Sequence, residues 1–325
     1  MPRVLAFFLV LLLALLAVGA GVAVGSVPLP LAEVASALLG NAPGPSADIV
    51  WKLRLPRTGA AFACGGLLAL AGALLQALLR NPLADPYIFG VSGGAALGVL
   101  LGMLLGAGAA LQTGLGLAGA LGVSVLVFLL GFRGGEWNPY RLLLTGVVMA
   151  AGLNALLGLV LVLAPQAAVK GMLYWLMGDL SYAEGAGGVL LALGILAIVV
   201  LPLARTLNVV SLGRTRALSL GVPVAAVEVL LYVLAAVATL AAVLVGGTIG
   251  FVGLVVPHLV RLLGLADHRW LLPASMLAGG GLLVLADTLA RSLWAPLQFP
   301  VGVLTALIGV PVLFLLLRKG RDAAH

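Results

Sequence analysis

Long apolar runs, separated by short polar breaks, make up almost the whole chain. The breaks contain proline, charged residues or clusters of Asn and Asp, and several of the apolar runs are shorter than a full membrane crossing. The runs cover residues 4–25, 55–79, 91–109, 112–132, 141–163, 187–203, 224–245, 249–265, 271–291 and 300–317. Because a helix needs about 20 mostly apolar residues to cross a bilayer, the pattern predicts an all-α polytopic membrane protein with about ten transmembrane helices.

Two stretches depart from this simple reading. The first run, which ends at Gly25, also fits a signal peptide, but its length of about 22 residues favours an uncleaved first helix. Between Ala164 and Ala186 only the short apolar piece KGMLYWLMGDL remains. It is too short to cross a membrane, so it predicts a re-entrant or interfacial half-helix, with Tyr174 and Trp175 at the interface.

The composition agrees with a membrane protein and excludes a soluble one. Hydrophobic residues make up 63% of the chain and charged residues 8%, and the mean hydropathy is +1.27. A net charge of +7 could suggest a nucleic-acid partner, but the longest basic run is Arg318-Lys319 and no aromatic residues are interleaved with it. Cys64 is the only cysteine, so no intramolecular disulfide can form. We expect one transmembrane domain over residues 1–325, with membrane lipid around it and no nucleic acid bound.

The basic residues fix the expected orientation. An even number of spans places both termini on one side of the membrane, and cytoplasmic loops carry an excess of Lys and Arg. With the termini in the cytoplasm, twelve of the 17 basic residues lie inside and five outside. The inside set is Arg3, Arg80, Arg133, Arg141, Arg205, Arg214, Arg216, Arg261, Arg269, Arg318, Lys319 and Arg321, and the outside set is Lys52, Arg54, Arg57, Lys170 and Arg291.

The third apolar run carries glycine at every fourth position. These glycines are Gly90, Gly94, Gly98, Gly102 and Gly106. A stripe of small residues on one helix face allows the backbone of another helix to approach closely. We therefore expect this helix to be buried inside the bundle.

A polar island, Ser211–Val222, interrupts two long apolar runs. Its sequence is SLGRTRALSLGV, with Arg214 and Arg216 in the middle and Gly213 and Gly221 toward its ends. Such a segment cannot lie in hydrocarbon, and it predicts a small surface helix capped by glycines. It is either a contact point for another protein or an ordinary cytoplasmic loop.

A second basic group lies on the side that should be poor in positive charge. Lys52, Arg54 and Arg57 surround the start of the second long helix, and Arg291 is a possible fourth member. One interpretation is a docking site for an acidic partner that approaches from outside. The other is anchoring to lipid headgroups.

If this membrane protein is a transporter, the chain should carry the groups that supply its energy, and two kinds of such groups are absent from the sequence. No lysine belongs to a phosphate-binding loop, because Lys52, Lys170 and Lys319 are followed by Leu, Gly and Gly. An ion-coupled secondary transporter needs ionisable groups within the membrane, whereas the only acids in the predicted spans, Glu228 and Asp287, lie near span ends. Power should therefore come from another polypeptide.

An intramembrane serine protease is a further alternative. Ser92 lies in Gly90-Val91-Ser92-Gly93-Gly94, which matches the GxSxG and GxSG patterns. A serine nucleophile needs a general base. Glycines and Pro257 shorten the span that contains His258, which is therefore expected at the inner end of that span, and His268 and His325 lie outside the predicted spans. We expect no catalytic residue, and the absence of an HExxH motif or a His/Cys cluster indicates no metal site.

Six motifs, in the same order, resemble the FecCD family of permeases. They are LRLPR, the NPLADP…GVSGGAALG stretch, Ser211–Val222, GFVGLVVPH, LADTLAR around Asp287, and the closing PVGVLTALIGVPVL, and the resemblance extends from about Val50 to Arg318. Members of this family are the membrane subunits of ATP-binding-cassette (ABC) importers for iron-siderophore complexes, haem and cobalamin.

The resemblance implies a type II ABC importer permease in a bacterial or archaeal inner membrane. It implies a homodimer, one ATPase subunit on each permease subunit and a periplasmic substrate-binding protein on the dimer. ATP and Mg²⁺ would bind to the ATPase, and this chain would hold no cofactor. Alternating access, driven by the ATPase, would move the chelate from periplasm to cytoplasm.

The resemblance also assigns expected roles to residues. Arg54, Arg57 and Arg291 would meet acids of the binding protein, and Asn138, Pro139 and Tyr140 would form an inner gate. A coupling loop at about residues 205–223 would contact the ATPase. The residues expected to do so are Ser211, Leu212, Gly213, Arg214, Thr215, Arg216, Ala217, Leu218, Ser219, Leu220 and Gly221. Thr215-Arg216 departs from the acid or alanine that the family often has there.

The fifth span is the expected lining of the translocation path. Helical spacing places six mostly small or apolar residues on one face, and these are Gly146, Met149, Ala150, Leu153, Asn154 and Leu157. Such a face would bind a bulky chelate weakly. The alternative is that the face packs on neighbouring helices. By resemblance, LYWLMGDLS favours cobalamin, with haem and ferric siderophores as the other candidates.

Overall fold

The computed structural model describes residues 2–41, 44–133, 136–137, 139–181 and 186–322. Nearly all of them are helical, and the one sheet is a two-stranded antiparallel pair, in which Phe132 lies opposite Trp137. The elements are α1 (Arg3–Ala23), α2 (Leu31–Leu38), α3 (Pro45–Asp48), η1 (Ile49–Arg54), α4 (Leu55–Leu79), η2 (Pro86–Phe89), α5 (Val91–Leu104), α6 (Ala109–Gly131), β1 (Phe132–Arg133), β2 (Glu136–Trp137), α7 (Pro139–Leu163), α8 (Gln166–Leu176), α9 (Ala186–Val200), η3 (Leu201–Leu203), α10 (Ala204–Ser211), α11 (Arg214–Ser219), α12 (Val224–Gly246), α13 (Val252–Leu262), α14 (His268–Ser292) and α15 (Val301–Asp322).

The helices confirm the predicted polytopic pattern. Among the described residues, 7 helical stretches are long and apolar enough to cross a membrane, and three shorter apolar helices lie in α5, α13 and α15. All ten correspond to the apolar runs of the sequence. The expected spans over residues 91–109 and 249–265 were too long, because α5 ends at Leu104 and α13 covers only Val252–Leu262. The predicted half-helix is α8.

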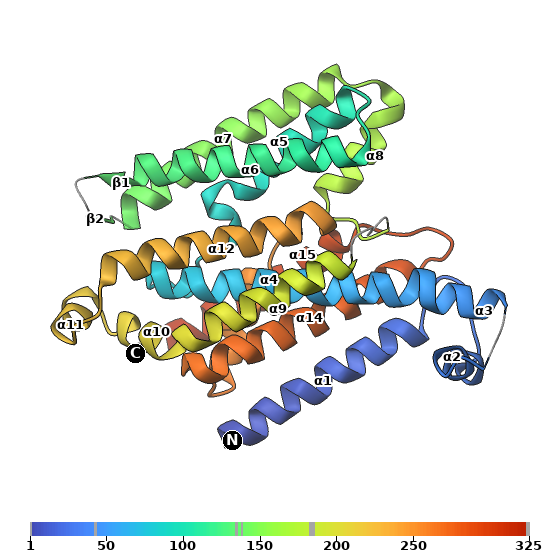
Figure 1. Cartoon of the computed structure of the whole chain (residues 1–325), viewed down its shortest axis with the longest axis horizontal. Helices are drawn as coiled ribbons and strands as arrows, with labels where there is room; N and C mark the ends of the chain where they lie inside the picture. The colour runs from blue at the N-terminus through green and yellow to red at the C-terminus, as the bar shows by residue number, and fades with distance from the viewer. Residues whose placement is uncertain (1, 42–43, 134–135, 138, 182–185, 323–325) are drawn as a thin grey trace.

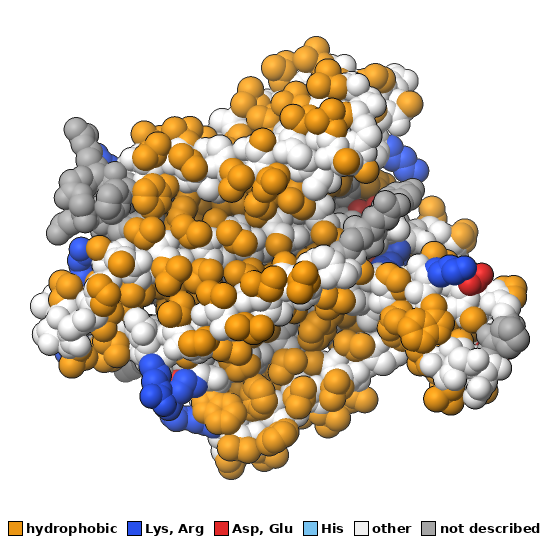
Figure 2. Space-filling view, viewed as in Figure 1, with side chains coloured by type: hydrophobic (Ala, Val, Ile, Leu, Met, Phe, Trp, Pro, Cys, Tyr) orange, Lys and Arg blue, Asp and Glu red, His pale blue; other side chains and the backbone are white. Residues whose placement is uncertain are grey.

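The long helices run roughly parallel to one another, so the bundle has two ends (Figure 1). One end carries α10 and α11 together with the β1–β2 pair, and we call it the α11 end. The opposite end carries α2 and α3, and we call it the α2 end. Figure 2 shows hydrophobic side chains over the length of the visible face, with most of the visible basic side chains toward the two ends. This distribution suits a bundle whose long sides face lipid.

Helix α4 is the centre of the bundle, between α12 and α14 (Figure 1). Most of its residues are buried, and its glycines allow two backbone contacts. A Cβ atom on Gly65 would lie 2.2 Å from the carbonyl oxygen of Gly279 in α14, and one on Gly72 would lie 1.9 Å from that of Gly253 in α13. Side chains are therefore excluded at both positions, and dispersion between closely packed backbones holds these helices together.

The glycine stripe of α5 faces α6, as the sequence predicted. A Cβ atom on Gly98 would lie 2.0 Å from the carbonyl oxygen of Leu115, and one on Gly94 would lie 2.4 Å from that of Gly119. The stripe ends at Gly102, since nothing lies within 4 Å of a Cβ on Gly106. Gly106 instead has a positive φ of 65° just after the helix. The stripe is a helix-packing surface.

We expect Gly98→Ala to destabilise the protein by about 1–3 kcal/mol, because the added methyl group overlaps the Leu115 carbonyl and forces α5 and α6 apart. The matched control is Gly122→Ala on α6, where nothing lies within 4 Å of the new atom. The control should be neutral or slightly stabilising, since alanine is the better helix former. Thermal unfolding of the detergent-solubilised protein measures both changes. Equal unfolding temperatures would show that the α5–α6 contact is not tight.

A few polar side chains bond to backbone groups inside the bundle, at the non-helical Ile249 and in the first turn of α13. The Tyr87 hydroxyl donates to the Ile249 carbonyl at 2.9 Å and accepts from the Ile249 N–H at 2.8 Å. The buried Gln76 amide donates to the Leu254 carbonyl at 3.1 Å, and its oxygen accepts from Arg261. Since lipid offers no hydrogen bonds, such backbone groups must be paired within the protein. The sequence analysis did not single out Gln76 or Tyr87.

Candidate coupling and docking sites

The polar island follows the short helix α10 and contains the short helix α11, both at the α11 end. α10 ends at Ser211 and α11 covers Arg214–Ser219, so the predicted surface helix is confirmed. Gly213, before α11, has φ +112°, and Gly221, after it, has φ +79°. Both values favour glycine, which can adopt positive φ without a clash of Cβ. The chain can therefore turn sharply on both sides of α11.

Helix α11 presents an exposed face. Thr215, Arg216 and Ser219 are exposed, whereas Ala217 is fully buried against the bundle. Leucines are also exposed here, and Leu220 has 64% of its surface accessible. Exposed leucines beside basic residues at the end of a helix bundle suit a contact with another protein better than contact with water.

Two polar contacts fasten this helix pair to the bundle. The Arg214 guanidinium lies 3.0 Å from a Glu228 carboxylate oxygen in α12, and Arg80 lies 4.0 Å from the other oxygen. In α10, the Asn208 amide donates to Asp267 at 2.8 Å, just before α14 begins. The sequence analysis missed Asn208, since its partner lies 59 positions further along the chain.

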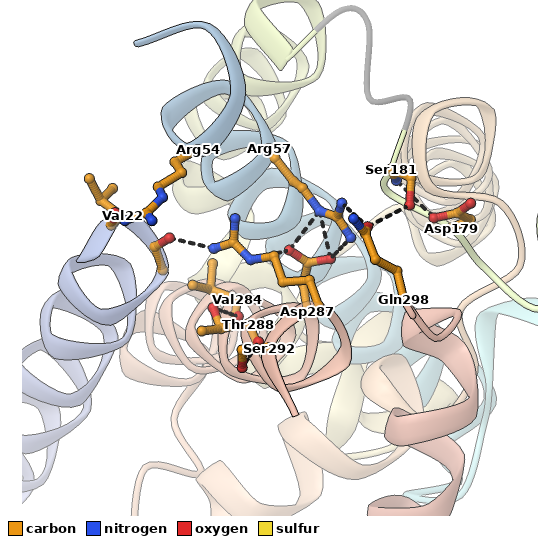
Figure 3. Close-up of polar contacts among 12 residues, drawn as sticks. Val22, Arg54, Arg57, Asp179, Ser181, Val284, Asp287, Thr288, Ser292 and Gln298 are labelled. Carbon is orange, nitrogen blue, oxygen red and sulfur yellow. Dashed lines mark hydrogen bonds and ion pairs between the residues drawn. The ribbon is translucent and has the colours of Figure 1, made fainter. Parts of the chain in front are cut away.

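At the α2 end, Arg57 lies between Asp287 and Gln298 (Figure 3). These three residues, together with Arg291 beside Asp287, form a connected group that we call the Arg57 cluster. Arg57 donates from Nη2 to Asp287 at 2.8 Å and from Nη1 to the Gln298 side-chain oxygen at 2.8 Å. Asp287 is 1% exposed, and Arg291 Nε lies 3.6 Å from its second oxygen. The cluster joins α4, α14 and the segment that follows α14.

Arg54 and Arg291 are buried, which contradicts the expectation that they present charge to a partner. Arg54 is 2% exposed and donates to the Val22 and Ala23 carbonyls at 3.0 and 2.6 Å. Arg291 is 4% exposed and donates to the Gly21 carbonyl. These oxygens belong to the last turn of α1, where carbonyls lack helical partners and cations are favoured. Both arginines therefore cap α1.

The expected path residues of α7 do not share one environment. Leu153 and Leu157 are buried, and a Cβ atom on Gly146 would lie 2.1 Å from the Ile88 carbonyl oxygen. These three residues pack on neighbouring helices. For them, the alternative interpretation, a helix-packing face, is the correct one. Asn154 is exposed, whereas Met149 and Ala150 are half-buried. The expectation of one lining face is wrong because α5 and η2 cover part of it.

An open groove of about 410 Å³ lies along α6 and α7. Its walls are mostly apolar. The lining residues are Leu129 and Leu130 of α6 and Arg141, Leu144, Thr145, Val148 and Met149 of the early turns of α7. Of the expected inner gate, Asn138 lies outside the described residues. Pro139 and Tyr140 begin α7, and their side chains also lie outside what the structure describes.

The protease pattern around Ser92 has no elbow geometry. Ser92 lies in the first turn of α5, which follows the 3-10 turn η2 and not a strand. No hydrogen bond joins Ser92 to a histidine among the described residues. Among all the residues that the structure describes, no group of three or more His, Cys, Asp or Glu side chains lies close enough together to hold a metal ion.

The fold and its two polar ends define the class of protein. The chain is a polytopic helical membrane protein with an exposed pair of short helices at one end of the bundle. A solved structure of an inward-facing metal-chelate type ABC transporter matches 98% of this chain and 99% of that chain, with a TM-score of 0.85 and 29% identity. PsaBC from Streptococcus pneumoniae shares the fold at a TM-score of 0.61 and 17% identity, covering 83% and 93% of the two chains.

Sequence comparison identifies the family. The FecCD transport family profile matches residues 9–319, and this chain belongs to that family. The haemin transport permease HmuU of Yersinia pestis is 39% identical, covering 99% of this chain and 97% of the relative. The vitamin B12 import permease BtuC of Salmonella paratyphi A is 40% identical, covering 84% of each.

Proposed function

We propose that this chain is the membrane-spanning permease subunit of an ATP-driven importer for a metal chelate. The observation that carries the proposal is the match of the whole chain to permeases of this family, together with the exposed helix pair α10–α11. The chain contains no phosphate-binding loop. ATP would therefore be bound and hydrolysed, with Mg²⁺, by a separate ATPase subunit.

The α11 end would face the cytoplasm and contact the ATPase. The excess of Lys and Arg at the predicted inner positions supports this orientation. In this orientation both termini would lie in the cytoplasm, and the bundle would lie in a bacterial or archaeal inner membrane. The residues from Ser211 to Gly221 would contact the ATPase through the exposed leucines in and beside α11. A periplasmic binding protein would dock at the α2 end, where Arg57 is the remaining candidate of the three expected arginines.

A second copy of the chain would complete the translocation path. Helix α7 leaves much of its apolar surface uncovered, and Val162 is 82% exposed. The exposed Asn154 and the groove beside Met149 lie on this helix. In a homodimer, the uncovered face of α7 would line a passage between subunits. A largely apolar passage would hold the chelate weakly and release it as the two sides alternate.

The substrate is one of three chelates: haem, cobalamin or a ferric siderophore. The expected preference for cobalamin rests on the sequence around α8. The haemin and vitamin B12 permeases match this chain at nearly the same identity, 39% and 40%. Because the two identities are almost equal, they support a metal chelate as the class of substrate and do not favour haem over cobalamin.

Native mass spectrometry of the tagged protein, gently extracted from its own membranes, tests the proposal. We expect two copies of this chain with two ATPase subunits, because neither the energy source nor a closed path is present in one chain. The absorption spectrum of a copurified ligand would distinguish a corrin, haem or ferric siderophore. A monomer without ATPase, together with uptake that fails when the proton gradient is dissipated but survives ATP depletion, would favour an ion-coupled secondary transporter.

A further inference from the structure

The side chain of Asn208 connects α10 to the beginning of α14. Its Nδ2 donates to Asp267 at 2.8 Å, and its Oδ1 accepts from the His268 backbone N–H at 2.9 Å. The same Oδ1 lies 2.7 Å from Nδ1 of the His268 ring. Asp267 in turn caps α14, because it accepts from the Arg269 backbone N–H at 3.0 Å. One amide side chain therefore bonds to both residues that begin α14.

The ionised state of Asp267 determines which atom of the Asn208 amide donates and which accepts a hydrogen bond. An ionised carboxylate only accepts hydrogen bonds, so the NH₂ group of Asn208 must face Asp267 and its oxygen must face His268. The Arg269 guanidinium, with help from Asn208, holds the pKa of the Asp267 carboxyl well below its usual range, so Asp267 stays ionised. His268 is 5% exposed, and water therefore cannot replace a lost partner at low cost.

Helix α14 extends from this contact to the opposite end of the bundle as one helical segment, with Pro273 in its second turn. It contains 25 residues, from His268 to Ser292, which corresponds to roughly 37 Å of helix. Near its far end, Asp287 binds Arg57 in the Arg57 cluster. Between the two contacts, Gly279 packs against the backbone of α4 at Gly65. Helix α14 is therefore in contact with α10 at its start, with α4 in its middle and with the Arg57 cluster near its end.

The second contact of the helix pair leads elsewhere. Arg214 binds Glu228 in α12, but α12 ends at Gly246. A Cβ atom on Gly246 would lie 3.5 Å from Cys64 Sγ, well inside α4, and the chain beyond is not helical. Helix α12 therefore ends inside the bundle and does not reach the Arg57 cluster. Among the described residues, two helices join a contact with α10 to the Arg57 cluster: α14, and α4, which packs on α10 and carries Arg57 itself. Of the two, α14 is the one that the Asn208 hydrogen bonds join to α10.

We propose that Asn208 is a positioning residue for energy coupling, which fastens the α10–α11 pair to α14. Movement of the pair by the ATPase then shifts the start of α14, and the packing of α14 on α4 carries the shift to the Arg57 cluster at the docking end. The inference rests on the proposed function, since it needs an ATPase at the α11 end. It adds a residue outside the exposed coupling surface and a route through the membrane.

The test measures transport per ATP hydrolysed in the assembly purified from its own membranes and placed in vesicles. Haemin and cyanocobalamin serve as probes, and the one that the wild-type assembly transports is used. We expect Asn208→Ala to hydrolyse ATP but to lower transport per ATP roughly ten-fold, since a hydrogen bond to a charged group is lost. The matched control is Asn41→Ala, an exposed asparagine at the α2 end, which should keep the wild-type ratio.

An exchange of the two side chains separates coupling from folding. Asn208→Asp alone places two carboxylates together and should uncouple transport. The double variant Asn208→Asp with Asp267→Asn restores donor opposite acceptor and keeps an N-cap residue before α14, so it should recover the wild-type ratio. The inference is wrong if the wild-type assembly and the Asn208→Ala variant transport the same amount of probe per ATP. It is also wrong if the double exchange does not restore the wild-type ratio. A wild-type assembly that transports without ATP would refute the proposed function instead.

Discussion

Asp287→Ala is expected to destabilise the folded protein by about 3–5 kcal/mol, because it removes the carboxylate that Arg57 and Arg291 share. Arg57 has only 12% of its side chain exposed, and Arg291 only 5%. Two guanidinium groups would then be left close together, with little water to stabilise their charge. Chemical or thermal unfolding of the detergent-solubilised protein measures the change.

The matched control is Asp48→Ala. Asp48 also pairs with a cation, Lys52, at 2.7 Å, but the two side chains are 64% and 72% exposed. An exposed ion pair of this kind contributes about 0–1 kcal/mol. We expect the control to unfold almost as the wild type does, and similar losses in the two variants would show that the Arg57 cluster is not buried as described.

A third variant distinguishes a lost pair from an unbalanced charge. Replacing Arg57 and Asp287 together by leucine removes one positive and one negative charge and keeps most of the volume, while Arg291 keeps its hydrogen bond to the Gly21 carbonyl. Such exchanges of buried ion pairs are often neutral or stabilising, so the double variant should be more stable than Asp287→Ala. If the double variant also docks the binding protein less tightly, Arg57 contributes to docking and not only to packing.

The double variant Gly213→Val with Gly221→Val is expected to abolish coupled transport while the bundle stays folded. Both glycines have positive φ, where a β-branched residue is strained by roughly 1–3 kcal/mol. Neither position has an atom within 4 Å of a Cβ, so the strain would be relieved by moving α11 and not by disturbing the core. Uptake and ATP hydrolysis, measured side by side, report the loss of coupling.

Gly264→Val provides the control for backbone strain alone. Gly264 follows α13, has φ +85° and also has nothing within 4 Å of a Cβ. It lies outside the Ser211–Gly221 segment, so strain of the same kind should leave transport close to wild type. Normal transport in the Gly213/Gly221 variant would show that α11 is an ordinary loop, whereas equal losses in both variants would point to general damage.

The sequence alone determined the class of protein and most of the elements. Apolar runs fixed the ten helices, since hydrocarbon requires long stretches without charge. Gly213 and Gly221 marked the turns around α11, and Gly94 and Gly98 marked the α5–α6 contact. These features are local, because they depend on the spacing of residues along one segment and on properties of glycine that hold in any surroundings.

Only the tertiary structure decided which side chains face a partner and which face the protein. Arg54 and Arg291 have the same charge as the exposed Lys52, but the end of α1 lies beside them and takes their hydrogen bonds. The face of α7 that carries Leu153 is covered by α5, and Asn208 meets Asp267 across 59 positions. Burial and pairing depend on contacts between distant segments, which spacing along the chain does not encode.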